Sequence, residues 1–169
     1  PKAMDLEDSS LWAPWLTSHR EDILALLDVR GAIELKAMTL AAEAVEANPE
    51  SQADLLERLR ENVRRWKVAA RDHDVPGLEE LDFEFHALVA EMSGNLFLLR
   101  LIRSINHVIS DRRAVLSVPG RPELSLAEHL RLLDALGRGD GREATEALAV
   151  HMDSLKETVR EFVGGRLPS

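Results

Sequence analysis

One stretch decides the fold: residues 78–95, which read LEELDFEFHALVAEMSGN. Its large apolar side chains recur every three or four positions, as on the buried face of an α-helix. They are Leu78, Leu81, Phe85, Leu88 and Met92. Asp82 and His86 are four residues apart, so they lie one turn apart on a face that borders this apolar stripe. The stretch therefore predicts a core helix, ended by Ser93-Gly94, that turns a carboxylate and an imidazole inward.

The same period extends to both sides of this stretch. Further helices are predicted over about 20–47, 50–72, 96–116, 125–137 and 140–163, with a short one near 9–16. We expect Asn48, Asn95 and Asp140 to cap three of them. Ser125 and Glu128 have the spacing of a capping box, which predicts a helix start at Ser125. The fold class is all-α: a single antiparallel helical bundle of six or seven helices, with 1–169 as one domain and a core over about 22–163.

Composition supports helices and excludes several classes of function. Hydrophobic residues make up 45% of the 169 positions and aromatic residues only 4%, while the abundant Leu, Ala, Glu and Arg are good helix formers. A net charge of −9 without a long basic run leaves no positive face for DNA phosphates. The absence of Cys removes disulfides, thiolate nucleophiles and Cys-ligated zinc, and no apolar run is long enough to span a membrane.

These features predict a cytoplasmic protein that has no membrane contact and does not bind DNA by itself. The sequence begins with Pro1-Lys2 rather than Met, so we also expect that an N-terminal partner domain is missing from it.

Two more histidines fall on predicted apolar stripes, His129 in the 125–137 helix and His151 in the 140–163 helix. Each histidine alone is better explained as a buried residue that is hydrogen-bonded to a neighbour. Together, however, three helices turn metal-capable side chains inward, and the buried Asp82 needs a cation or donors nearby. Asp82, His86, His129 and His151 form a nitrogen and oxygen ligand set for one divalent ion. Zn²⁺ is the first choice, and Ni²⁺, Mn²⁺ and Fe²⁺ are alternatives.

Three polar residues are candidates for binding a small molecule. Arg30 lies on the apolar stripe of the 20–47 helix, where it either pairs with Glu34, four residues on, or points its guanidinium at a ligand carboxylate. Asn106 and Arg113 are seven residues apart and fit the same cavity, although a surface position of Arg113 is an equal alternative. No ligand role is expected for the remaining histidines, His19, His73 and His107.

Several short motifs resemble those of a known family, the FCD domain, which is the C-terminal effector domain of FadR-type regulators in the GntR superfamily. The motifs are VRGAIE at 29–34, D-x-x-F-H at 82–86, S-G-N at 93–95, E-H at 128–129, G-D at 139–140 and a final His at 151. The resemblance covers about 22–162. Each motif alone is weak, but the ordered set is rather specific.

The resemblance implies a helical bundle that holds a divalent metal through Asp82, His86, His129 and His151. It implies a small organic-acid effector beside this metal, with Arg30 near the ligand; the match of Asn106 and Arg113 is looser. Family members form homodimers and bind DNA through an N-terminal winged helix-turn-helix, which is absent from this sequence. The helix near 9–16 resembles the extra helix of a seven-helix branch.

Two other classes of function compete with a metal-dependent sensor of a transcription regulator. A metal-dependent enzyme of hydrolase or lyase type is the first, but the sequence has no H-E-x-x-H motif and no spare general base, because Glu84 points away from the Asp82–His86 face. A structural dimerisation domain with hydrogen-bonded core histidines is the second. We therefore expect no enzymatic activity.

Overall fold

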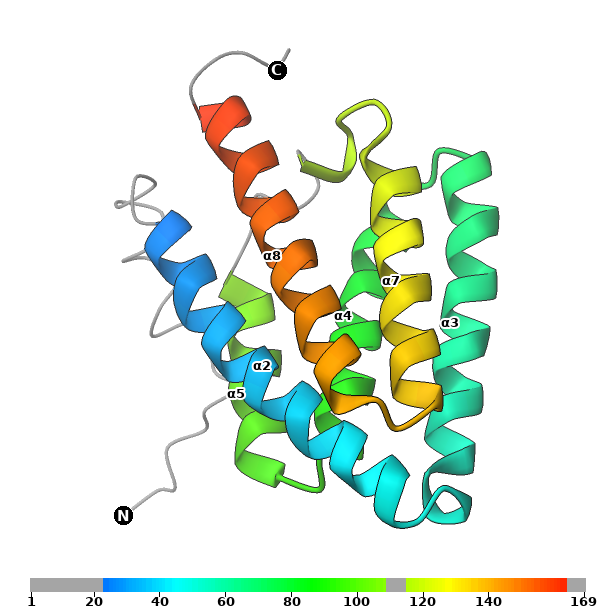
Figure 1. Cartoon of the computed structure of the whole chain (residues 1–169). Coiled ribbons are helices and arrows are strands. Elements are labelled where there is room, and N and C mark those ends of the chain that lie inside the picture. The colour runs from blue at the N-terminus through cyan, green and yellow to red at the C-terminus, as the bar shows by residue number, and fades with distance from the viewer. Residues whose placement is uncertain (1–22, 109–114, 164–169) are drawn as a thin grey trace, which may run out of the picture.

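The computed structural model describes residues 23–108 and 115–163, which form helices joined by short turns (Figure 1). In chain order the elements are α2 (Ile23–Ala47), the 3₁₀ helix η3 (Glu50–Gln52), α3 (Ala53–Arg71), α4 (Val75–Met92), α5 (Leu96–Val108), α7 (Arg121–Gly137) and α8 (Gly141–Val163). No strand occurs in these two ranges. The predicted all-α bundle is confirmed. The helix expected near 9–16 and the 109–114 part of the predicted 96–116 helix lie outside the described residues.

Helices that follow one another in the chain run antiparallel, as the pairs α3–α4 and α7–α8 show in Figure 1. α4 contacts α2, α3 and α5, and α7 lies between α3 and α8. α2 packs along α8 and also contacts α4 and α7. The interior between α2, α4, α7 and α8 is therefore the place where the predicted polar residues can meet.

Three helix starts follow the predicted capping residues Asn48, Asn95 and Asp140. Each side-chain oxygen accepts a hydrogen bond from a backbone N–H two or three residues later, at 3.0–3.2 Å. Such caps satisfy donors that the first helical turn leaves without a partner. The predicted starts at Asn95 and Asp140 are confirmed. Asn48 instead caps the turn that contains η3, and α3 itself begins at Ala53, after Gln52, which makes no side-chain capping bond.

α4 begins earlier than its predicted start at Leu78. Asp74 caps the helix by accepting a hydrogen bond from Gly77 N at 3.1 Å, and Val75 and Pro76 already belong to the first turn. Proline is compatible with this position because the first turn needs no N–H from it. The helix therefore starts three residues before Leu78, with Asp74 as its capping residue.

The predicted start of the 125–137 helix is wrong. α7 begins at Arg121, after Gly120 in the left-handed conformation (φ 82°) and with Pro122 in its first turn. Ser125 and Glu128 lie inside the helix, and the Glu128 carboxylate accepts a hydrogen bond from Arg121 instead of closing a capping box. The S-x-x-E spacing occurs by chance in a helix interior, whereas Gly120 and Pro122 are a stronger start signal.

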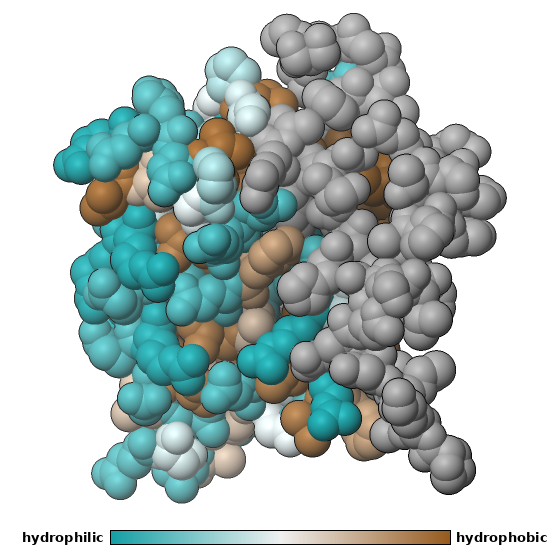
Figure 2. All heavy atoms as spheres, turned by 180° about the vertical axis from the view of Figure 1, so that it is seen from behind, coloured by the Kyte–Doolittle hydropathy of each residue, from teal (hydrophilic) through white to brown (hydrophobic). Residues whose placement is uncertain are grey.

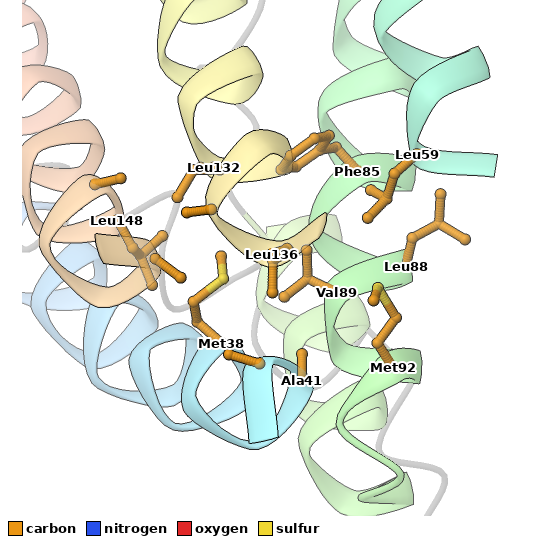
Figure 3. Close-up of a cluster of buried hydrophobic side chains, with 14 of the residues drawn as sticks. Met38, Ala41, Leu59, Phe85, Leu88, Val89, Met92, Leu132, Leu136 and Leu148 are labelled. Carbon is orange, nitrogen blue, oxygen red and sulfur yellow. The ribbon is translucent and has the colours of Figure 1, made fainter. Parts of the chain in front are cut away.

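Figure 3 shows part of the main hydrophobic core cluster. Leu and Met side chains from five helices interdigitate there, among them Met38, Leu59, Leu88, Met92, Leu132, Leu136 and Leu148. Phe85 is fully buried in this cluster. It also touches a histidine ring, so the core and the polar interior share this residue.

A glycine allows the α7–α8 turn to approach α2. Gly139 has a φ of 66°, and a Cβ at this position would lie 3.1 Å from the backbone N and Cα of Glu46. Only glycine adopts this conformation cheaply and leaves room for the neighbouring backbone. The turn thereby holds the start of α8 against the end of α2.

Figure 2 shows the face opposite to that of Figure 1, where the described surface is largely hydrophilic with apolar side chains between. Among the described residues, no helix combines the length and the apolar character that crossing a bilayer requires.

Candidate metal centre

The four predicted metal ligands meet in the bundle interior. Asp82 and His86 come from α4, His129 from α7 and His151 from α8, and all four are buried. One candidate ligand atom from each lies within 4.8 Å of all the others. His86 Nε2 and His129 Nε2 are each 3.6 Å from Asp82 Oδ1. Residues from three helices therefore surround one point.

The imidazole nitrogens at this point lack protein partners. His86 Nε2, His151 Nε2 and both ring nitrogens of His129 are buried without a hydrogen bond. Buried polar atoms are nearly always paired, so several such atoms facing one another point to a missing group. Ligands on opposite sides of a metal ion lie about 4.2 Å apart when each bond is about 2.1 Å. The cluster fits a divalent ion after shifts of a few tenths of an ångström.

An arginine and a glutamate of α2 hold the first histidine. His86 Nδ1 lies 2.9 Å from Glu34 Oε2, and Arg30 Nε donates to Glu34 Oε1 at 2.5 Å. We call this set the α2 triad. The carboxylate keeps the proton of the ring on Nδ1, which leaves the lone pair of Nε2 directed toward Asp82.

A second set of the same kind holds the histidine of α8. His151 Nδ1 lies 2.8 Å from Glu128 Oε2, and Arg121 Nη2 donates to the same oxygen at 2.9 Å. Arg121 Nη1 also donates to Ser154 Oγ at 2.6 Å. We call Arg121, Glu128 and His151 the α7 triad. It leaves Nε2 of His151 available as a ligand, as the α2 triad does for His86.

The third histidine is held by aromatic rings. The ring of His129 stacks on Phe85 with a centroid separation of 4.2 Å and an interplanar angle of 4°. Trp66 meets it edge-on at 5.0 Å and is itself fixed by a hydrogen bond of 2.9 Å from Nε1 to the carbonyl of Pro122. Packing, rather than a carboxylate, therefore orients His129.

The electrostatic environment keeps two of the rings neutral. Burial lowers the pKa of His129 well below its usual value, and burial also lowers the pKa of His151. Burial likewise disfavours the charged form of His86, but the negative Glu34 overrides it and raises the pKa of His86. For Glu34, burial opposes ionisation, yet Arg30 and His86 outweigh it and lower the pKa of this carboxyl. Neutral imidazole is the form that binds metals.

A small cavity of about 20 Å³ adjoins the cluster. Its lining includes Asp82 and His151 together with two arginines, Arg30 of α2 and Arg121 of α7. Arg30 is only 1% exposed, and its Nη1 and Nη2 have no hydrogen-bond partner. The pairing of Arg30 with Glu34 through Nε is confirmed, and Nη2 lies 3.8 Å from Asp82 Oδ2. The binding of a ligand carboxylate by Arg30 stays a prediction.

The other sequence candidates lie elsewhere. Asn106 is buried and lines a separate depression together with Arg58 and Arg103, away from the arginine-lined cavity. Arg113 and His19 lie outside the described residues, as does the side chain of His107. His73 is exposed in the turn before α4, with a φ of 54°.

Glu84 binds Asn62 and Arg65 of α3. This agrees with the prediction that it points away from Asp82 and His86.

Sequence reasoning did not identify Glu34 or Glu128 as partners of histidines, and it missed Arg121 entirely. The position of Glu34, one turn after Arg30 on an apolar stripe, was the available signal for the α2 triad. For Arg121 there was no signal, because the helix that contains it was expected to begin later.

This geometry defines a class of protein: an all-helical domain with a buried three-histidine, one-aspartate cluster beside a cavity lined by arginines. A comparison with protein families assigns the chain to a known family. The sequence pattern of the FCD domain matches residues 25–154, and the chain belongs to this family.

Curated relatives of the chain are named as transcriptional regulators. The HTH-type transcriptional regulator LutR of Bacillus subtilis is 25% identical over 153 residues, which are 87% of this chain and 66% of that protein. The HTH-type transcriptional repressor RspR of Escherichia coli is 27% identical over 79% of this chain and 57% of its own length. A putative L-lactate dehydrogenase operon regulatory protein of E. coli is 27% identical, with 81% and 51% covered. The chain thus spans between half and two thirds of the length of these relatives.

Proposed function

We propose that this domain binds one divalent metal ion through Asp82, His86, His129 and His151 and senses a small organic acid for a bacterial transcription regulator. The observation that carries the proposal is the set of buried imidazole nitrogens without partners that face one aspartate. In a purely structural core these nitrogens would stay without hydrogen bonds, and burying polar atoms without partners costs free energy.

The ligand chemistry favours zinc. Three neutral imidazoles and one carboxylate form a shell of nitrogen and oxygen donors, and cysteine is absent from the chain. Zinc binds such shells readily, and nickel, manganese and iron(II) are the alternatives. The two triads support this assignment, because metal-binding histidines usually donate their second N–H to a carboxylate.

The effector is a carboxylic acid that binds in the cavity beside the cluster. A divalent ion balanced only by Asp82 retains positive charge and attracts an anion. Arg30 offers Nη1 and Nη2 to the same anion, and two parallel N–H groups match the two oxygens of a carboxylate. Asn106 and Arg113 remain proposals, and the position of Asn106 in a separate depression weakens its part.

The regulatory step is a change in the packing of the helices. Cavity and cluster draw residues from α2, α4, α7 and α8, so occupancy of the site favours one arrangement of these four helices. The effector shifts the population only as far as its affinity for the two arrangements differs. In the regulator this shift acts on DNA through a separate helix-turn-helix domain, in a homodimer. The names of the relatives support this role and speak against catalysis.

Elemental analysis and thermal unfolding test the proposal together. The purified chain should contain about one divalent ion, and small carboxylic acids should raise its melting temperature through mass action. The same acids should have no effect after the ion has been removed by a chelator. A chain without bound metal, or equal shifts with and without chelator, would contradict the proposal.

A further inference from the structure

We propose that the outer face of α5 is the docking surface for the N-terminal segment of the same chain, residues 4–16. We call this face the α5 patch, and its members are Leu96, Phe97, Arg100 and Leu101. The inference goes beyond the proposed function, because the docking requires neither a metal ion nor an organic acid.

The α5 patch gathers exposed apolar side chains on one helix. Leu96, Phe97 and Leu101 are 56%, 70% and 37% exposed. Residues one, four and five positions apart lie on the same face of an α-helix, so these side chains are neighbours. Isolated exposed apolar residues are ordinary on protein surfaces, whereas a group of them on one face indicates an interaction site.

The described helices cover only the inner side of α5. Ile102 is buried in a small cluster with Ala37 of α2 and Ala90 of α4, and Leu98 and Leu99 pack against this cluster. Figure 1 shows α5 beside α2 at the edge of the bundle. Because the patch residues are exposed, the part of the chain that the structure describes leaves this face of α5 uncovered.

The N-terminal segment has the apolar pattern that fits the α5 patch. It lies outside the described residues, and its sequence predicts a short helix near 9–16. Its large apolar side chains stand at helical spacing and are Leu11, Trp12, Trp15 and Leu16. Two of the three tryptophans of the chain are among them, and tryptophan is enriched where protein surfaces meet. A helix there would present one apolar face to α5.

Charge complementarity favours this segment over a second copy of the chain. α5 carries Arg100 and Arg103 and no acidic residue. The stretch 3–18 carries Asp5, Glu7 and Asp8 and no lysine or arginine. Docking of the segment therefore brings opposite charges together. Two α5 patches paired around a two-fold axis would instead bring arginines of both copies close to one another, which is unfavourable.

The segment is long enough to reach the patch. The chain enters α2 at Ile23, and α2 packs along α5. Ile33, which packs against the cluster of Ile102, lies about 15 Å further along α2 at a rise of 1.5 Å per residue. Leu16 precedes Ile23 by seven residues, and these span up to roughly 25 Å when extended. Leu16 and the residues before it can therefore lie against α5.

A docked segment fixes the direction in which the chain enters α2. This helix supplies Arg30 and Glu34 to the α2 triad. A domain that precedes the segment would then be held against the bundle instead of being joined by a free tether. Only this last consequence rests on the proposed function, in which such a domain binds DNA.

Hydrogen exchange of the full chain, measured by mass spectrometry, tests the inference. In wild type the backbone amides of residues 11–16 should exchange at least about tenfold more slowly than in a synthetic peptide of residues 1–22. Phe97→Asp removes the most exposed apolar side chain of the patch and places a negative charge opposite an acidic segment. It should return these amides to the rate of the peptide, while the amides of α4 stay protected.

Two further variants sharpen the test. Val150→Asp is the matched control, because it places the same charge on an exposed apolar residue of α8, and the protection of residues 11–16 should remain. Arg100→Glu keeps the apolar part of the patch, so it should lower the protection only about two- to fivefold, as expected for an exposed ion pair.

Three outcomes would overturn the inference. The first is rapid exchange of residues 11–16 in wild type. The second is protection that persists in Phe97→Asp, because the segment then packs elsewhere. The third is a lower mass of Phe97→Asp in sedimentation with unchanged exchange of residues 11–16, because a second copy then covers the patch. Should Phe97→Asp not fold, Leu101→Asp provides the same test.

Discussion

The candidate metal centre holds its histidines in two different ways. His86 and His151 each have Nδ1 within 2.9 Å of a glutamate that an arginine binds, which forms the α2 and α7 triads. His129 has no carboxylate partner and instead lies between Phe85 and Trp66. A carboxylate sets both the direction of a ring and the nitrogen that carries its proton, whereas aromatic packing sets only the direction.

The two triads also differ from each other. Glu34 is 3% exposed and its pKa is lowered, because Arg30 and His86 outweigh the effect of burial. Glu128 is 9% exposed and shares Arg121 with Ser154. The α2 triad is thus the more enclosed of the two, and disturbing it should cost more. Four predictions test these differences, from the largest expected effect to the smallest.

Replacing the histidine held by packing should abolish metal binding. His129→Ala removes one of four ligands, so the metal content should fall from about one ion per chain to less than about a tenth. Helicity should be largely retained, because many apolar side chains of the hydrophobic core hold the α-helices together. Elemental analysis and circular dichroism measure the two quantities, with the exposed His73→Ala as control. An unchanged metal content in His129→Ala would refute the assignment of the ligands.

Replacing the glutamates should separate the two triads. Glu34→Gln and Glu128→Gln should each weaken zinc binding about 10- to 100-fold, as is typical for residues that orient metal ligands. Each change leaves a buried arginine without its carboxylate, but the loss should be greater for Glu34→Gln. Arg30 and Glu34 are the more deeply buried pair, and Arg121 keeps its hydrogen bond to Ser154. Competition with a chromophoric chelator measures both affinities, and Glu84→Gln is the control on the outer side of α4. Equal losses would show that the greater enclosure of Glu34 has no energetic consequence.

Removing the metal should lower stability. An ion present at about 100 times its Kd contributes about 2.7 kcal/mol to the free energy of unfolding. For a domain of this size that corresponds to a decrease of roughly 5–10 °C in Tm on chelation. Scanning calorimetry with and without chelator measures it. His129→Ala should not respond to the chelator, and a response equal to that of wild type would place the ion elsewhere.

The metal-free domain should lose stability as the pH falls below about 6.5. His129 and His151 have lowered pKa values in the folded state, so the unfolded chain binds more protons in this range, and acid favours unfolding. His86 acts in the opposite direction, because its raised pKa lets the folded state keep a proton that the unfolded chain loses at higher pH. Each group changes the free energy by at most about 1.4 kcal/mol per pH unit.

Urea unfolding between pH 5 and 7, in chelator, measures this dependence. His129→Phe should reduce the slope, since it removes one group that resists protonation while keeping an aromatic ring against Phe85. An unchanged slope would show that His129 does not contribute to it.

The local features of the helices followed from the sequence. The apolar stripe from Leu78 to Met92 predicted α4, and the short polar side chains of Asn48, Asn95 and Asp140 predicted helix starts. Period and capping depend on residues that are near in the chain, so a single sequence carries them. The start of α7 was misjudged because S-x-x-E spacing also occurs within helices, and only the fold showed that Glu128 faces Arg121.

By itself, the sequence determined which side chains turn inward: Asp82, His86, His129 and His151 stand on or beside apolar stripes whatever the arrangement of the helices. The tertiary structure alone decided which of them meet and what supports them. Glu34 reaches His86 because α2 packs against α4, and Arg121 reaches Ser154 because α7 packs against α8. Such contacts depend on the angles and offsets at which helices pack, and these are set by the fit of many side chains at once rather than by any local pattern.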